Sequence, residues 1–453
     1  MTISALILAA GQGTRMRSAL PKVLHPLAGR PLLHHVHNAA AELTDDIHIV
    51  YGHGGSRVVE ALSGLNANWI EQREQLGTGH AVMQALPHLK PDGNVLILYG
   101  DVPLITTETL KQLLKIAQGG EFALLTVELN QPTGYGRIVR DERGQVLRIV
   151  EEKDASDAER AIREINTGIM ALPGERLSGW LARLNNHNVQ GEYYLTDVIG
   201  LAVQDGIAVR TVAPESPYEV MGVNNRAQLA ELERYYQLMQ AEFLMGEGVT
   251  LADPARFDLR GNLEVGQDIF IDINVLIEGE VKIGNNVSIG PHNVLRNVII
   301  GDDVEILPHC DINGAIIGKG ARIGPFTRVR PGTEFAEGVH IGNFVEVKKS
   351  KVGKSSKINH LSYIGDSEVG CRVNIGAGTI TCNYDGANKH LTVIEDDVFV
   401  GSDTQLVAPV RIGKGATVGA GTTVTKDVPP GVLAVGRVQQ AVKEGWKRPE
   451  KKK

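Results

Sequence analysis

The sequence of 453 residues predicts two folds in succession, a doubly wound α/β unit followed by a parallel β-helix. In the N-terminal half, short apolar runs alternate with helical patterns, which is typical of a mostly parallel sheet covered by helices. In the C-terminal half, aliphatic residues recur every six positions between Val265 and Val424. A period of six fits neither a helix nor a two-sided strand, and it indicates short strands that turn a corner at each hexad.

The N-terminal alternation contains three apolar runs that we expect to be strands and two helical patterns between them. The runs cover 5–9, 47–51 and 95–99, and the helical patterns cover 31–43 and 78–86. In such Rossmann-like sheets, ligands bind at the carboxyl ends of the strands. Residues that directly follow the first and third runs are therefore candidate site residues.

The first candidate is the loop 8–16, which follows the first predicted strand. Its small residues let backbone N–H groups approach phosphate oxygens, and Arg15 and Lys22 can neutralise phosphate charge. The loop lacks the third glycine of a dinucleotide fingerprint and the Gly-Lys-Ser/Thr ending of a Walker A loop. Taken alone, its Gly11-x-Gly13 is explained equally well by an ordinary tight turn.

The second candidate is Asp101, just after the apolar run 95–99. A carboxylate at this place suits a Mg²⁺ ion that also binds phosphates. The alternative is an aspartate that caps the next helix.

The hexad pattern of the C-terminal half predicts coils that bury their aliphatic residues against the coils before and after them. Glycine often follows the inward residue, as in Ile283-Gly284 and Ile289-Gly290. We expect these glycines to take backbone dihedrals that other residues avoid. A β-sandwich with glycine-rich turns is the alternative, and the length of the pattern argues against it. The spacing does not define handedness, but similarity to the known hexapeptide β-helices implies a left-handed one.

Composition is typical of a soluble globular protein, with 42% hydrophobic and 22% charged residues. The net charge of -7 argues against a nucleic-acid partner, since only 447–453 is basic. No apolar run approaches the roughly 18 residues that a membrane span requires, so no membrane insertion is expected. Cys310, Cys371 and Cys382 form no close-spaced pair and are expected to be free thiols in a reducing cytoplasm.

Two further patterns suggest structure rather than chemistry. Residues 226–246 carry apolar side chains at helical spacing among polar ones, which predicts one amphipathic helix between the two halves. His34, His35 and His37 are expected on a helix surface rather than around a metal ion.

Six motifs in the N-terminal half resemble those of the sugar-nucleotide pyrophosphorylases and occur in the same order. They cover residues 8–16, 21–22, 75–80, 100–103, 134–137 and 166–168. With the hexad region attached, the whole chain resembles the bacterial bifunctional N-acetylglucosamine-1-phosphate uridylyltransferases and glucosamine-1-phosphate N-acetyltransferases. The resemblance implies a uridylyltransferase domain over 1–225, a linker helix over 226–247, and a left-handed β-helix acetyltransferase domain with a C-terminal tail over 248–453.

For the uridylyltransferase site, the resemblance implies catalytic roles for Arg15 and Lys22 and Mg²⁺ ligation by Asp101 and Asn224. Within the binding set, Gly136, Glu151 and Asn166 would hold the N-acetylglucosamine group. The residues that would bind UTP and the UDP-sugar are Leu8, Ala9, Ala10, Gly11, Lys22, Gln72, Gly77, Thr78, Tyr99, Gly100, Asp101, Gly136, Glu151, Asn166 and Asn224. No protein nucleophile is needed, because the attacking phosphate of N-acetylglucosamine 1-phosphate is already ionised.

A second group of unusual residues lies within a few hexads. Basic and polar side chains gather there, and stacked coils could bring them to one groove that suits an anionic sugar phosphate. The residues are Arg328, Arg330, Lys348, Lys349, His360, Tyr363 and Asn374. A lone histidine in a repeat is more often packing, but the motif 359–365 matches the acetyltransferase site of the resembling family.

That resemblance implies that His360 is a general base and Glu346 its helper. It further implies that glucosamine 1-phosphate is bound by Arg330, Lys348, Tyr363 and Asn374. The implied acetyl-CoA residues are Ala377, Asn383, Tyr384, Ser402, Ala420 and Arg437.

The expected protein is a cytoplasmic homotrimer that makes UDP-N-acetylglucosamine, a precursor of cell-wall and outer-envelope sugars. One alternative is a monofunctional sugar-1-phosphate nucleotidylyltransferase with a regulatory β-helix. Another is a scaffold without activity. The presence of Lys22, Asp101 and His360 favours the bifunctional enzyme over both.

Overall fold

The computed structural model describes residues 2–52, 54–436, 439–449 and 451. The chain forms two compact units, Met1–Tyr236 and Gln237–Lys453, with the boundary inside the long helix α8 (Arg226–Gly246). Of the helices in the described ranges, none is long and apolar enough to cross a membrane.

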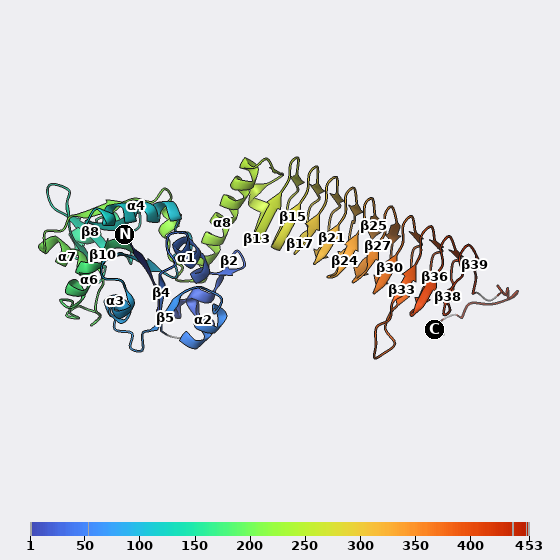
Figure 1. Cartoon of the computed structure of the whole chain (residues 1–453), viewed down its shortest axis with the longest axis horizontal. Helices are drawn as coiled ribbons and strands as arrows, with labels where there is room; N and C mark the ends of the chain where they lie inside the picture. Colours follow the sequence, from blue (N-terminus) through green and yellow to red (C-terminus); the bar gives the residue numbers. More distant parts are fainter. Residues whose placement is uncertain (1, 53, 437–438, 450, 452–453) are drawn as a thin grey trace. The chain divides into compact units, whose positions relative to one another are not determined.

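The first unit is built on a sheet that has nine strands within the described residues (Figure 1). Its main path is β11-β7-β10-β6-β1-β4-β5, and the pair β8 and β9 extends from β10. The strands are β1 (Ile3–Ala9), β4 (Ile47–Tyr51), β5 (Asn68–Glu71), β6 (Asn94–Tyr99), β7 (Phe122–Glu128), β8 (Arg137–Arg140), β9 (Val146–Val150), β10 (Glu164–Pro173) and β11 (Val209–Val212). A small separate hairpin joins β2 (Pro26–Leu27) to β3 (Arg30–Pro31).

Helices cover both faces of this sheet, which confirms the doubly wound arrangement. Ala5 and Ile7 of β1 pack in one core layer with α1, α2 and α4, while Leu6 and Leu8 pack in the other with α3, α6 and α7. Successive residues of a strand point to opposite faces, so a strand buried on both sides must be apolar throughout. The helices are α1 (Leu32–Ala41), α2 (Gly55–Ala61), α3 (Thr78–Ala85), α4 (Thr107–Gln118), α5 (Asp157–Arg160), α6 (Gly174–Leu181) and α7 (Asp197–Gln204). The short 3-10 turns are η1 (Thr14–Met16), η2 (Lys22–Leu24), η3 (Leu86–His88), η4 (Pro217–Val220) and, in the second unit, η5 (Pro254–Arg256).

The predicted strands and helices are present as β1, β4, β6, α1 and α3. The sequence did not indicate β10, a ten-residue strand that runs antiparallel to both β6 and β7 in an otherwise mostly parallel sheet. The prediction of a surface histidine is wrong for His37, which is 6% exposed and lies within hydrogen-bonding distance of the Asn66 carbonyl.

The second unit is a parallel β-helix whose coils stack in register (Figure 1). One sheet of this unit has eleven strands within the described ranges. They are β12 (Thr250–Leu251), β14 (Phe270–Ile271), β16 (Ser288–Ile289), β19 (Glu305–Ile306), β22 (Arg322–Ile323), β25 (His340–Asn343), β28 (Lys357–His360), β31 (Asn374–Ile375), β34 (Phe399–Val400), β37 (Thr417–Val418) and β39 (Leu433–Ala434).

The remaining faces of the β-helix belong to a second continuous sheet. Its strands are β13 (Phe257–Val265), β15 (Val275–Ile283), β17 (Val294–Arg296), β18 (Ile299–Ile300), β20 (Asp311–Asn313), β21 (Ala315–Ile317), β23 (Arg328–Val329), β24 (Thr333–Phe335), β26 (Glu346–Lys348), β27 (Lys351–Val352), β29 (Tyr363–Gly365), β30 (Ser367–Val369), β32 (Ile380–Cys382), β33 (Thr392–Ile394), β35 (Gln405–Val407), β36 (Val410–Ile412) and β38 (Thr423–Val424).

The aliphatic residues of the hexad pattern form the core of the β-helix, as predicted. Ile271, Ile289, Val347 and Ile364 are all fully buried in one continuous hydrophobic cluster. Each therefore packs on the residue one coil away, and the stability of the unit comes from stacking.

The reason for the glycines differs from the expected one. Gly284 and Gly290 are not among the residues with positive φ. A Cβ on Gly284 would lie 2.6 Å from Asp302 Oδ1 of the next coil, so glycine is needed for the close approach of coils. The left-handed backbone falls three residues after the inward aliphatic residue, at Asn286 and His292 with φ of 54° and 61°. Asn, Asp and His tolerate that conformation better than other side chains do.

Helix α8 is one helix as expected, but two of its helically spaced apolar residues, Met239 and Phe243, are 36% and 64% exposed. The two ends of the helix belong to different cores. Leu232 is buried in a cluster of the first unit. Ala241 and Leu244 are buried in the β-helix core, and the Gln237 amide exchanges two hydrogen bonds with the backbone of Leu259, at 2.7 and 2.9 Å.

Candidate active sites

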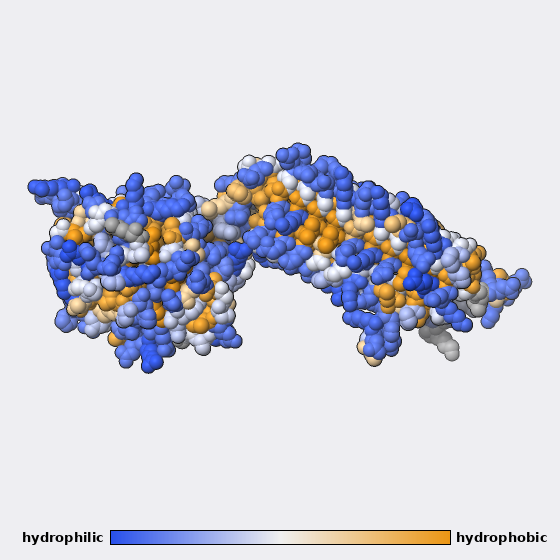
Figure 2. All heavy atoms as spheres, viewed as in Figure 1, coloured by the Kyte–Doolittle hydropathy of each residue, from blue (hydrophilic) through white to orange (hydrophobic). Residues whose placement is uncertain are grey.

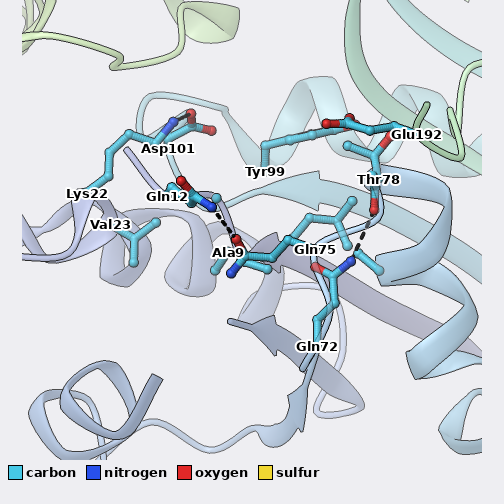
Figure 3. A pocket seen from close by; sticks show the side chains of 15 residues that line it. Ala9, Gln12, Lys22, Val23, Gln72, Gln75, Thr78, Tyr99, Asp101 and Glu192 are labelled. Carbon is cyan, nitrogen blue, oxygen red and sulfur yellow. Dashed lines mark hydrogen bonds and ion pairs between the residues drawn. The ribbon is translucent and has the colours of Figure 1, made fainter. Parts of the chain in front are cut away.

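A pocket of about 430 Å³ lies at the carboxyl ends of the parallel strands β1 and β6. Lys22 and Asp101 lie together at one end of it, and Thr78 and Glu192 lie at the other (Figure 3). The residues that line it are Leu8, Ala9, Ala10, Gly11, Gln12, Lys22, Val23, Gln72, Gln75, Gly77, Thr78, Ala81, Tyr99, Asp101 and Glu192. Ten of the residues predicted to bind UTP or the UDP-sugar are in this set.

Strand register explains why two distant loops meet here. Leu8 of β1 pairs with Tyr99 of β6 in a parallel ladder, so the chain leaves both strands at the same level. A Cβ on Gly11 would meet nothing within 4 Å, which leaves open space beside the loop backbone. Gly13 has a φ of 61°, so the loop also contains the tight turn that was the alternative interpretation. The tight turn is thus present at Gly13, and the phosphate-binding interpretation of the loop stays a prediction.

Four polar side chains converge next to this pocket. The Lys22 ammonium donates to Asp101 and, at 3.3 Å, to Oδ1 of Asn224. The Arg15 guanidinium donates to the same Asn224 oxygen at 2.9 Å. Two oxygens from distant parts of the chain thus face one cation, and carboxylate and amide oxygens are ligands that Mg²⁺ prefers. In the described part of the chain, no group of three or more His, Cys, Asp or Glu side chains is placed to hold a metal.

Asp101 does not cap the next helix. The side chain of Thr106 is the N-cap of α4 and accepts a hydrogen bond from the backbone N–H of Thr109 at 3.3 Å. The carboxylate of Asp101 is therefore not used by the helix terminus that the alternative interpretation required.

The residues predicted for the N-acetylglucosamine group form a second cluster beyond Tyr99. The backbone N–H of Asn166 donates to the Gly136 carbonyl at 2.9 Å. A Cβ on Gly136 would lie 3.4 Å from Oε1 of Glu151, and that oxygen accepts from the Thr196 hydroxyl at 2.9 Å. Burial raises the pKa of Glu151 above the ordinary value, although the Thr196 hydrogen bond opposes this.

Tyr99 connects the two clusters of the first unit. A Cβ on Gly168 would clash with its ring at 2.4 Å, so only glycine fits on β10 at that point. Burial raises the pKa of the Tyr99 phenol, and the charges of Glu151 and Asp101 add to this effect. The phenol is therefore neutral at physiological pH and available as a hydrogen-bonding group.

Three polar residues of the pocket were not predicted. Gln12 and Gln75 form a hydrogen bond at 3.0 Å that joins two lining loops. Glu192 lies next to Gly77, where an added Cβ would be 2.9 Å from the Glu192 Cβ. Gln12 and Gln75 lie inside motifs that the sequence already contained, whereas 192 is in a loop with no distinct pattern.

On the β-helix, several predicted residues meet on the larger sheet. Glu346 pairs in register with Tyr363, and its carboxylate accepts from Arg330 at 2.9 Å. Lys348 donates to Asp366 at 3.1 Å. Within the described ranges, no hydrogen bond joins Glu346 to His360, so the helper role of Glu346 stays a prediction.

Other predicted residues lie on a different face of the β-helix. Asn374 belongs to the smaller sheet, where it pairs with Lys357 and Phe399 rather than with the residues around Tyr363. His360 is exposed at the end of β28 and pairs with Asn343. A single chain therefore does not collect the whole predicted sugar-phosphate set in one groove.

The small residues predicted for acetyl-CoA share one position on successive coils. Ile375 pairs with Val400, and Val400 pairs with Val418, which puts Ala377, Ser402 and Ala420 in one column. Small side chains in a column leave a flat strip along which an extended ligand can lie. The predicted Arg437 is outside the described residues.

The loop between β32 and β33 carries Asn383 and Tyr384, two of the residues predicted for acetyl-CoA, together with one cation that was missed. The pKa of Lys389 is lowered because its amine lies against the ammonium of Lys348. A hydrogen bond with the Lys389 amine and another with the Asp366 carboxylate raise the pKa of Lys348. Two adjacent amines suit a dianionic phosphate. Lys389 stands in an insertion of the hexad pattern, a position where binding loops are common, so it could have been found.

Fold and sites together define a nucleotidyltransferase domain followed by a hexapeptide-repeat transferase domain. A family model of the MobA-like NTP transferase domain matches 5–166. The GMPPB C-terminal domain matches 259–352, and the bacterial transferase hexapeptide (six repeats) matches 391–426.

Curated proteins match the chain from end to end. The "Bifunctional protein GlmU" of Methylococcus capsulatus is 58% identical over 453 residues, covering 100% of this chain and 98% of that protein. Proteins of the same name from Azoarcus sp. and Pseudomonas putida are 59% and 56% identical, each covering 100% of both chains. The chain belongs to the bifunctional GlmU family.

Proposed function

We propose that this protein makes UDP-N-acetylglucosamine in two steps at two separate sites. The β-helix transfers an acetyl group from acetyl-CoA to glucosamine 1-phosphate, and the N-terminal unit transfers a uridylyl group from UTP to the product. Membership of the bifunctional GlmU family over the full chain is the observation that carries this proposal. Because the first step uses acetyl-CoA and the second uses UTP, both from general metabolism, we propose the cytoplasm as the place of action.

In the uridylyltransferase domain, assigned to 1–225, the sugar phosphate oxygen attacks the α-phosphorus of UTP and pyrophosphate leaves. The lining residues Leu8 to Gly11 approach the nucleotide through their backbone, and Gln72 and Thr78 hold the base. Gly136, Glu151 and Asn166 hold the sugar. Lys22 and Arg15 neutralise the charge that moves onto the leaving group, which is where most of the rate acceleration of phosphoryl transfer arises.

A divalent metal fits the cluster beside the pocket, and we propose Mg²⁺. The fit rests on the Asp101 and Asn224 oxygens, which both face the Lys22 ammonium and so form a position for a cation. The metal would supply charge neutralisation on the phosphates. Since only two protein oxygens are offered, the remaining ligands would come from phosphate and water.

In the acetyltransferase domain, assigned to 248–453, the amine of glucosamine 1-phosphate attacks the thioester carbon of acetyl-CoA. His360 takes the proton that the amine loses, and coenzyme A leaves as the thiol. Arg330, Lys348 and Tyr363 bind the sugar phosphate. Acetyl-CoA lies along the column of small residues and contacts Asn383 and Tyr384 of the loop. Residues 226–247 link the two domains.

We further propose that neighbouring copies complete the acetyltransferase site in a homotrimer. The separation of Asn374 from Tyr363 on one chain supports this, because a second copy could supply the missing face. A ladder of stacked rings runs along one corner of the β-helix, with His309 and Phe326 centroids 4.8 Å apart and Phe326 and Phe344 centroids 5.3 Å apart. Phe344 is 59% exposed, and Figure 2 shows apolar side chains gathered along the β-helix. Exposed apolar surface of this extent is typical of an interface.

Paired assays on one purified sample test the proposal. One follows thiol release from acetyl-CoA with glucosamine 1-phosphate, and the other follows pyrophosphate release from UTP with N-acetylglucosamine 1-phosphate and Mg²⁺. We expect both activities. Pyrophosphate release alone would favour a monofunctional nucleotidylyltransferase with a regulatory β-helix, and the absence of both would favour a scaffold.

A further inference from the structure

We propose that Asp366 is a positioning residue of the acetyltransferase site, which holds Lys348 and the loop 383–391 in the arrangement that receives glucosamine 1-phosphate. This inference rests on the proposed acetyltransferase function and assigns a role to a residue that binds no substrate itself. Asp366 follows β29 at a corner between two strands of the larger sheet.

The side chain of Asp366 is the meeting point of groups from two successive coils and the loop. Its carboxylate accepts from Lys348 at 3.1 Å and from the Asn383 amide at 2.5 Å. The Lys349 ammonium lies 3.9 Å away. Asp366 is 8% exposed and Asn383 is 7% exposed, so these contacts are shielded from water and screened little by salt.

The backbone of Asp366 fixes the same two elements. Its N–H donates to the Lys348 carbonyl at 3.0 Å, and its carbonyl accepts from the N–H of Thr392 at 3.1 Å. Asn383 lies near the start of the loop and Thr392 directly follows its end. One residue therefore holds both ends of the insertion and the lysine opposite.

Electrostatics explain why a carboxylate is needed at this position. The amines of Lys348 and Lys389 lie against each other, and two like charges in contact repel. Burial raises the pKa of Asp366, but the hydrogen bonds from Lys348 and Asn383 outweigh it and leave that pKa below the ordinary value. The ionised carboxylate thus keeps Lys348 charged and in place before a phosphate arrives.

The substitution Asp366→Asn tests this role without a large change of shape. Asp366 has a φ of 46°, a conformation that asparagine tolerates as well as aspartate does. We expect the KM for glucosamine 1-phosphate to rise about tenfold, the order of a lost charge-assisted contact, while kcat changes by less than about twofold. Pyrophosphate release by the same sample should be unchanged, because that site lies in the other unit.

A matched control is Asp397→Asn. Asp397 is also a corner aspartate with positive φ, 62°, and its carboxylate accepts two hydrogen bonds from Arg372 at 2.6 and 2.9 Å. It is an ion pair outside the proposed site, and the Asp397 side chain is 39% exposed. We expect no change in the KM for glucosamine 1-phosphate beyond about twofold, as for ordinary surface pairs.

A double substitution separates positioning from general stability. If Asp366 acts through Lys348, adding Asp366→Asn to Lys348→Met should raise KM by no more than about threefold, since coupled residues are not additive. A full tenfold effect in both backgrounds, or equal KM values for wild type and Asp366→Asn, would overturn the inference. A fall of pyrophosphate release and of the melting temperature together with acetyl transfer would also overturn it, because the residue would then be merely structural. Absence of thiol release in the wild type would instead refute the proposed function.

Discussion

The two sites differ in how the chain brings their residues together. In the N-terminal unit, Lys22 contacts Asp101 across 79 residues and Asn224 across 202. In the β-helix, Lys348 and Asp366 are 18 residues apart, which is three hexads. Topology assembles the first site and a fixed repeat assembles the second. In a solenoid, the spacing of residues along the sequence therefore predicts which side chains meet. In a doubly wound sheet, the order of the strands is needed to predict such contacts.

The largest effect is expected from removal of the His360 side chain, which should strongly lower one activity and spare the other. A positioned general base contributes about 10²- to 10⁴-fold, so His360→Ala should lower thiol release by that factor and leave pyrophosphate release intact. Both rates are measured on one sample. His340→Ala is the control, because His340 is a half-buried histidine of the same β-helix that has no role in either proposed site. Equal loss in both variants would show that the effect is not catalytic.

The reverse separation comes from Lys22. Removal of one preorganised cation from a phosphoryl-transfer site should lower pyrophosphate release by about 10²- to 10³-fold, with thiol release unchanged. Lys115→Ala on α4 is the control, since Lys115 is exposed in the last helical turn. Near-normal turnover of Lys22→Ala would remove Lys22 from the mechanism.

A third test measures how much the buried core of the β-helix contributes to stability next to the acetyltransferase site. Ile364 is fully buried one residue from Tyr363, so Ile364→Ala should cost about 2–5 kcal/mol in the free energy of unfolding of the β-helix. Ile316 is 48% exposed, and Ile316→Ala should cost within about 0.5 kcal/mol. Calorimetry of both variants measures the difference. Similar melting of the two would contradict the stacked-core account.

The features that were predicted correctly are those that leave a regular pattern of apolar residues in the sequence. The hexad aliphatics, the five N-terminal elements and the loop after β1 were found because burial leaves a pattern in the residues themselves. The role of Gly284 was wrong because close contact with Asp302 of the next coil is not visible in a local pattern. The αL corners at Asn286 and His292 carried a signal, namely Asn, Asp or His three residues after the aliphatic.

The rest depended on contacts that the chain makes at a distance. Antiparallel β10 brings Gly168 against the ring of Tyr99, and nothing local in β10 indicates its direction. Asp366 has no place in the hexad core pattern, so its role emerges only from the three side chains that meet it. The basic cluster was foreseen, but its distribution over two faces was not, since that depends on which sheet each strand joins.

The smallest expected effect compares carboxylates in opposite environments within the first unit. Burial raises the pKa of Glu151, so the folded state keeps a proton that the unfolded chain has already lost. The free energy of unfolding of the wild type should therefore fall as pH rises from the ordinary glutamate value through the raised one. Glu151→Gln cannot ionise, and its stability relative to wild type should rise over the same interval.

For Glu164, the stability of the glutamine variant relative to wild type should change with pH in the opposite direction. Hydrogen bonds from Arg140, at 2.6 and 2.7 Å, outweigh burial and lower the pKa of Glu164. Its stabilisation is present above the ordinary pKa and lost as pH falls, so Glu164→Gln should lose stability relative to wild type as pH rises. Urea unfolding followed by the fluorescence of buried Trp180, from pH 3 to pH 7, measures both differences. Curves that move in the same direction would show that burial and pairing do not set these two pKa values.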